Sequence, residues 1–75
     1  MQIDKEIDAR GLNCPLPLMK AKMAIGAMAS GQVLRVVATD SGSMRDILAF
    51  AKQAGHEMIE QSHVGKEYIH LLRRG

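Results

Sequence analysis

The chain contains a single cysteine, Cys14, at the head of the tetrapeptide Cys14-Pro15-Leu16-Pro17. An extended apolar segment precedes the tetrapeptide and a helical pattern follows it, so the thiol is expected at the entrance of a helix. The positive end of a helix dipole and the unpaired N–H groups of a first turn both favour thiolate over thiol. Because the thiolate is the nucleophile, Cys14 is the candidate catalytic residue, and we expect a modestly lowered thiol pKa.

The two prolines suit the first turn of a helix. Pro15 fits the first helical position, because its fixed φ matches the helix and its missing N–H would be unpaired there anyway. Pro17 still lies within the tolerated first turn, which leaves the N–H groups of Leu16 and Leu18 as the nearest donors to the sulfur. The competing interpretation is that Cys14 is a small buried apolar residue, the commoner environment of a free cysteine.

Size and composition predict one small domain, residues 1–75, with an aliphatic core. A chain of 75 residues can fold alone around a single core. Hydrophobic residues make up 47% of the chain and charged residues 24%, which argues against disorder. The net charge is only +2 and no Lys/Arg run is present, so we expect no stable nucleic-acid binding.

The first residues and the cysteine content favour a cytoplasmic protein. Residues 1–8 mix charged and apolar side chains and lack the basic region and apolar stretch of a secretory signal. With no membrane-spanning stretch and no second cysteine for a disulfide, the thiol is expected to stay reduced. His56, His63 and His70 have no compact metal-ligand spacing, so no metal site is predicted.

Hydrophobic periodicity predicts the order strand, helix, strand, helix, strand, strand. Strands are expected at residues 2–9, 32–39, 56–63 and 67–73, with a hairpin turn at 64–66. Helices are expected at residues 15–29 and 43–54; Ser43 and Asp46 resemble a capping box, and Gly55 is a stop signal. Right-handed crossovers would place both helices on one face of a mixed four-stranded sheet, giving a two-layer α/β sandwich.

The first predicted helix has two apolar stripes. Leu18, Ala21, Ile25 and Met28 form one that can pack on the sheet. The other consists of Leu16, Met19 and Met23 and shares the helix end that bears Cys14. We predict that this second stripe, with Lys20, is an exposed docking surface for partner proteins. The alternative is that the second helix covers it.

The chain resembles the TusA/SirA-like sulfur carriers along essentially its whole length. The resemblance rests on the Gly-Leu-x-Cys-Pro-x-Pro signature within residues 8–17, followed by Gly31, Asp40, Arg45 and Asp46. It implies an open two-layer sandwich with an exposed cysteine at the start of the first helix. It also implies that Cys14 carries sulfur covalently as a persulfide, without a separate cofactor, and that the other motif residues support it: Gly11, Pro15, Pro17, Arg45 and Asp46.

The resemblance implies a class of partners as well. Sulfur would come from a cysteine desulfurase or a rhodanese-type donor and pass to a DsrE/TusD-type acceptor, by sulfurtransferase-type transfer between proteins. In one branch of the family the sulfur ends in thiolated tRNA, and in another it enters dissimilatory sulfur oxidation. Some tRNA-thiolation members have an acidic residue where this chain has Leu16, which leaves the pathway open; overall similarity favours sulfur oxidation.

Charged residues around the motif have two interpretations. Four basic residues are either solvated surface charges or groups that steer acidic partners and stabilise an anionic persulfide: Arg10, Lys20, Lys22 and Arg45. For Asp40 and Asp46 we favour capping or bracing of the second helix over direct chemistry.

Two functions from other classes remain open. A thiol peroxidase or redox sensor would pass through a sulfenic acid at Cys14, although the chain has no resolving cysteine. A small RNA-binding domain would bind through its sheet or through Arg73 and Arg74, and its binding would survive Cys14→Ser. The sulfur carrier ranks first, the redox protein second and the RNA-binding domain third.

Overall fold

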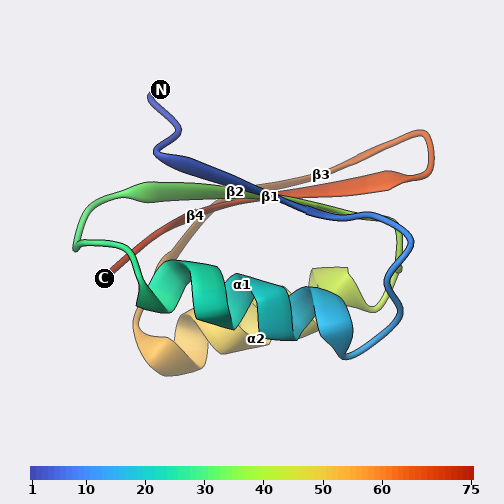
Figure 1. The fold of residues 1–75 in the computed structure, drawn as a ribbon, viewed down its shortest axis with the longest axis horizontal. Coiled ribbons are helices and arrows are strands. Elements are labelled where there is room, and N and C mark those ends of the chain that lie inside the picture. Colours follow the sequence, from blue (N-terminus) through green and yellow to red (C-terminus); the bar gives the residue numbers. More distant parts are fainter.

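Two helices pack on one face of a four-stranded mixed sheet in the computed structural model, which describes residues 1–75 (Figure 1). The elements are β1 (Lys5–Ala9), α1 (Leu16–Gly26), β2 (Val33–Ala38), α2 (Ser43–Ala54), β3 (Glu57–Val64) and β4 (Glu67–Arg73). The strand order is β1-β2-β4-β3, with β1 parallel to β2 and the other pairs antiparallel. The predicted βαβαββ two-layer α/β sandwich is therefore confirmed.

The core lies between the helices and the sheet. In β2, alternate residues Leu34, Val36 and Ala38 face the helices, as expected for a strand with a period of two. The stripe Leu18, Ala21, Ile25 and Met28 packs into the same cluster, as predicted. Neither helix combines the length and apolar character that crossing a membrane requires.

Helix α1 ends at Gly26, earlier than the expected Ala29. The N–H of Met28 donates to the carbonyl of Ile25 at 3.1 Å, which is an i→i+3 bond that tightens the chain after the helix. Arg74 Nε also donates to the Ile25 carbonyl, at 2.9 Å. These bonds satisfy a terminal carbonyl without another α-helical turn.

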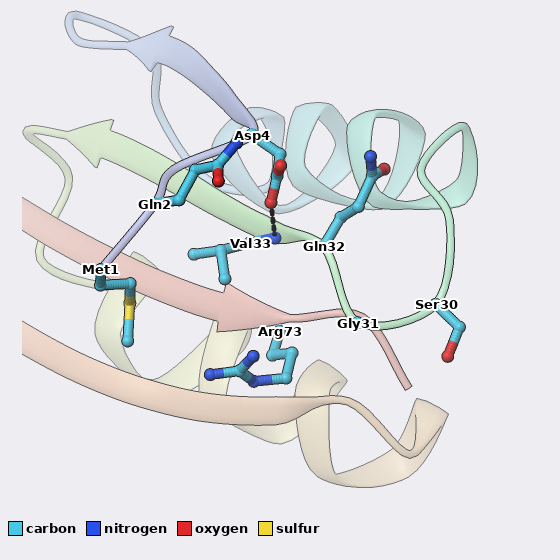
Figure 2. Close-up of a pocket in the computed structure, with 8 residues that line it drawn as sticks. All are labelled: Met1, Gln2, Asp4, Ser30, Gly31, Gln32, Val33 and Arg73. Carbon is cyan, nitrogen blue, oxygen red and sulfur yellow. Dashed lines mark hydrogen bonds between the residues drawn. The ribbon is translucent and has the colours of Figure 1, made fainter.

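Strand β1 begins at Lys5 rather than at Gln2. The reason is that the side chain of Asp4, and not a backbone carbonyl, accepts the next hydrogen bond from β2. Asp4 Oδ2 accepts the N–H of Val33 at 2.8 Å (Figure 2). The N–H of Asp4 also donates to the Val33 carbonyl, at 2.9 Å. Ile3 lies before this bond and is exposed. The boundaries of the other strands differ from the expected ones by at most one residue.

Candidate functional site

Cys14 lies exposed in the loop that enters α1. The helix begins one residue later than expected: Pro15 is the N-cap, Leu16 the first helical residue and Pro17 the second. Pro17 is buried, so the motif attaches the loop to the core while its thiol faces solvent. The exposure of Cys14 contradicts the alternative that it is a buried core residue.

The sulfur does not contact the N–H groups that the sequence suggested. The Leu16 N–H donates to the carbonyl of Asn13 at 2.9 Å, and no backbone N–H forms a hydrogen bond with Sγ. Cys14 Sγ instead donates to Asp46 Oδ2, at 3.2 Å. This contact joins the entrance of α1 to the first turn of α2, and both helices begin at the same end of the sandwich (Figure 1).

The environment raises the pKa of the Cys14 thiol, so the expected lowering is wrong. The first cause is the hydrogen bond to Asp46, which stabilises the protonated thiol. Partial desolvation and the negative charges of Asp46 and Asp40 act in the same direction, and only the nearby charge of Arg45 opposes them. At neutral pH the unloaded residue is therefore predominantly a thiol.

Asp46 does not cap α2. The N-cap is Gly42, and no side chain bonds the helix terminus, so the predicted capping box is absent. The carboxylate of Asp46 is mostly covered, with 21% of the side chain exposed, and its Oδ1 lies 3.5 Å from Nε of Arg45. Arg45 itself is 86% exposed, so this ion pair is weak. Direct contact with the thiol is the main interaction of Asp46.

A buried hydrogen-bonded cluster fixes the start of α2 and hence Asp46. His70 of β4 is fully buried; its Nε2 lies 3.1 Å from Ser43 Oγ and its Nδ1 3.1 Å from Nε2 of Gln61. Gln61 Nε2 also donates to the Met44 carbonyl at 2.8 Å. Because an amide nitrogen only donates, Nδ1 of His70 accepts and Nε2 carries the proton.

Sequence reasoning gave this cluster no role, although a signal was present. His70 shares a face of β4 with Leu72, a core residue, and pairs with buried Val36 of β2, so it occupies an inward position of the strand. A polar residue at an inward position needs a buried partner. That partner is Ser43, which the sequence analysis had instead assigned to the predicted capping box of the second helix.

Gly11 and Asp40 frame the loops on either side of the thiol. The N–H of Gly11 donates to Oγ1 of Thr39 at 2.9 Å, and its φ of 77° favours glycine. This bond ties the loop before Cys14 to the end of β2.

Asp40 Oδ2 is buried and has no hydrogen-bond partner; a Cβ at Gly42 would lie 3.0 Å from it. Asp40 is thus not a side-chain cap either.

Three of the four basic candidates are engaged elsewhere. Arg10 pairs with Asp8 at 2.9 Å and with Glu67 at 3.2 Å. Lys20 Nζ donates to the Asp8 carbonyl at 3.0 Å, and Lys22 Nζ lies 5.5 Å from the ring centroid of Phe50. Among these four, only Arg45 acts electrostatically on Cys14.

The second apolar stripe of α1 is exposed. Leu16 is 46% exposed, Met19 51% and Met23 77%. Helix α2 therefore does not cover them, which contradicts the alternative raised from the sequence. The thiol stands at one end of an open apolar surface.

Neither depression in the surface contains Cys14. One, of 560 Å³, lies beside Asp4, Ser30 and Arg73, beyond the opposite end of α1 (Figure 2). The other, of 220 Å³, lies over Arg35 and Val37 of β2. The thiol is therefore open to solvent and lies outside both depressions.

The comparisons with known proteins agree with this geometry. A family model described as Sulfurtransferase TusA matches residues 5–74. The chain is similar to the sulfur carrier protein TusA of Allochromatium vinosum (52% identical, over 95% of this chain and 93% of the relative) and to that of Pseudomonas aeruginosa (39% identical, over 96% and 91%). Among solved structures, a SirA-like protein from Desulfitobacterium hafniense superposes with a TM-score of 0.77 at 26% identity, over 92% of this chain and 93% of the other. The relatives from Allochromatium vinosum and Pseudomonas aeruginosa are both named sulfur carrier proteins, and this chain belongs to the TusA family.

Proposed function

We propose that this protein carries sulfur as a persulfide on Cys14. The observation that carries the proposal is the exposed thiol at the entrance of α1, in a chain whose relatives are named sulfur carriers. The absence of a second cysteine supports it, because a persulfide on Cys14 cannot be discharged as an intramolecular disulfide.

Two transfers make up the proposed cycle. In loading, the sulfur of Cys14 attacks the outer sulfur of a donor persulfide, the donor S–S bond breaks and the donor sulfur leaves as a thiolate. In unloading, a thiolate of the acceptor attacks the outer sulfur on Cys14, and Cys14 returns to its starting form. No net oxidation or reduction occurs, since a sulfane sulfur moves from one thiol to another.

The exposed stripe is the proposed docking surface. Leu16, Met19 and Met23, with Lys20 beside them, offer an adaptable apolar area adjoining the thiol. The donor would be a cysteine desulfurase or a rhodanese-type protein, and the acceptor a protein of the DsrE/TusD type, in the cytoplasm. Between the two pathways of the family, we favour sulfur oxidation over tRNA thiolation.

The sequence and the structure each weaken one rival function. A thiol peroxidase or redox sensor has to resolve the sulfenic acid it forms, and this chain has no second cysteine to do so. For RNA binding, Arg73 pairs with Glu57 at 3.3 Å and Arg74 donates to the carbonyl of Ile25, so both proposed phosphate ligands have partners within the chain.

Intact-protein mass spectrometry tests the proposal. The reduced protein is incubated with glutathione persulfide, and separately with a purified cysteine desulfurase and its cysteine substrate, with Cys14→Ser in parallel. We expect a gain of one sulfur atom that dithiothreitol removes and that the variant lacks, because only the thiol can hold it. A protein that alkylates readily at Cys14 yet gains no sulfur from either donor would contradict the proposal.

A further inference from the structure

The hydrogen bond between Cys14 and Asp46 places a carboxylate base beside the thiol that would attack a sulfur donor. Sγ, in the loop that enters α1, donates its proton across 3.2 Å to Oδ2 of Asp46, in the first turn of α2. The proton that must leave Cys14 when it attacks therefore already points at a base. That carboxylate is held in the first turn of α2, close to the cluster that anchors Ser43 to His70.

We propose that Asp46 is the catalytic acid and base of sulfur transfer: it takes the proton of the Cys14 thiol on loading and returns it on unloading. The inference rests on the proposed sulfur-carrier function. A positioned carboxylate within hydrogen-bond reach of the proton it abstracts meets the geometric requirement for a general base.

The loading step balances with Asp46 as the base. The Cys14 sulfur forms a bond to the outer sulfur of the donor persulfide while its proton moves to Oδ2. The donor S–S bond breaks and its electron pair leaves on the donor thiolate. One negative charge passes from Asp46 to that thiolate, and the transferred sulfur keeps its own proton, so no outside oxidant or reductant is needed.

Unloading is the same step in reverse with a different partner. The acceptor thiolate attacks the outer sulfur, the bond between that sulfur and Sγ breaks, and Sγ takes the proton from protonated Asp46. A neutral thiol is thereby restored in place of a thiolate held 3.2 Å from a carboxylate. Asp46 thus lowers the barrier both when the Cys14 sulfur attacks, in loading, and when it is the leaving group, in unloading.

Asp40 provides a matched control. Its negative charge also disfavours the Cys14 thiolate, but it makes no hydrogen bond with the sulfur. Asp40→Asn therefore removes a nearby charge without removing the base. If charge alone governs Cys14, Asp40→Asn and Asp46→Asn will change its reactions in the same way.

The test compares two reactions of Cys14 at neutral pH. Alkylation by iodoacetamide reports the thiolate fraction, and sulfur loading from glutathione persulfide, followed by mass spectrometry, reports transfer. Asp46→Asn should speed alkylation, because the charge that disfavours the thiolate is gone. It should nevertheless lower the ratio of the loading rate to the alkylation rate by about tenfold or more, since positioned acid–base groups contribute about 10²–10⁴-fold. Asp40→Asn should speed both reactions together.

Several outcomes would overturn the inference. If Asp46→Asn speeds loading as much as alkylation, the carboxylate only suppresses the thiolate; if alkylation does not speed up, Asp46 does not hold the proton. Circular dichroism and thermal unfolding establish that each variant folds, and Asp46→Ala replaces an Asn variant that does not. A wild-type protein that never gains sulfur would contradict the proposed function itself, which separates the two failures.

Discussion

The pKa of Cys14 is decided by one contact between residues that are 32 positions apart. The sequence pointed to Cys14 as the candidate nucleophile but predicted the wrong direction for its pKa. The dipole of α1 acts on an exposed helix entrance where solvent screens it, whereas Asp46 accepts a direct hydrogen bond from the thiol. The carboxylate of Asp46 therefore outweighs the dipole of α1. The dipole argument is local and can be made from the sequence, whereas the decisive contact is tertiary.

Arg45 should modestly promote the thiolate. Its charge lowers the pKa of Cys14, so Arg45→Gln should slow alkylation by iodoacetamide at pH 7 and low salt. The expected factor is about two to five, as for a single interaction between exposed charges. The effect should fade in 1 M salt, where screening is strong. Lys66→Gln, in the turn between β3 and β4, is the control; an equal slowing there would contradict a local effect of Arg45.

Helix α1 shows which properties of an element can be predicted from sequence. Its two apolar stripes were found correctly, because their spacing reflects the 3.6-residue period of the helix itself. Its end was not, because Arg74, from the far end of the chain, takes the carbonyl of Ile25. The start of β1 was likewise shifted by the bond between Asp4 and Val33. Element boundaries thus depend on partners that the local pattern does not contain.

The exposed stripe of α1 and the core beneath the helices predict different effects of the same substitution. Met19→Glu lies on the exposed stripe and should leave the unfolding free energy within about 0.5 kcal/mol of the wild type. It should still prevent loading by a purified cysteine desulfurase while leaving loading by glutathione persulfide intact, because only the protein donor needs the docking surface. The control, Met28→Glu, places a charge in the core and should cost about 2–5 kcal/mol. Normal loading of Met19→Glu by the desulfurase would rule out docking at this stripe.

At the scale of the whole molecule, the topology assembles the site. Strands β1 and β2 are parallel neighbours, so the loops after their carboxyl ends emerge at the same edge of the sheet. One loop carries Cys14 into α1 and the other leads into α2 with Asp46, which is the general location of sites in open α/β sheets. The predicted βαβαββ order already implied that these loops are adjacent. It did not show which side chain of the second loop or helix would reach the thiol, because that depends on how α2 is rotated about its axis.

The rotation of α2 is anchored by His70, and the whole fold should therefore lose stability in mild acid. Burial lowers the pKa of His70 from 6.5 to about 4, so the unfolded chain binds a proton at a pH where the folded protein does not. The free energy of unfolding therefore keeps its full value above pH 6.5 and falls as the pH drops toward 4. Since each unit of pKa difference corresponds to ~1.4 kcal/mol, the loss reaches up to about 3 kcal/mol. Protonation at Nδ1 would also oppose two donors, since Gln61 Nε2 already donates there.

Urea unfolding at intervals between pH 7 and pH 4 measures this loss. His70→Gln should be less stable at pH 7, because the cluster with Ser43 is disrupted, but its stability should depend less on pH over the same range. His63→Gln is the control, because His63 lies exposed beside Tyr68 near the β3–β4 turn and should keep the wild-type slope. An unchanged slope in His70→Gln would assign the acid sensitivity to other groups. A flattened slope would show that the buried imidazole of His70 must stay neutral for the fold to keep its full stability.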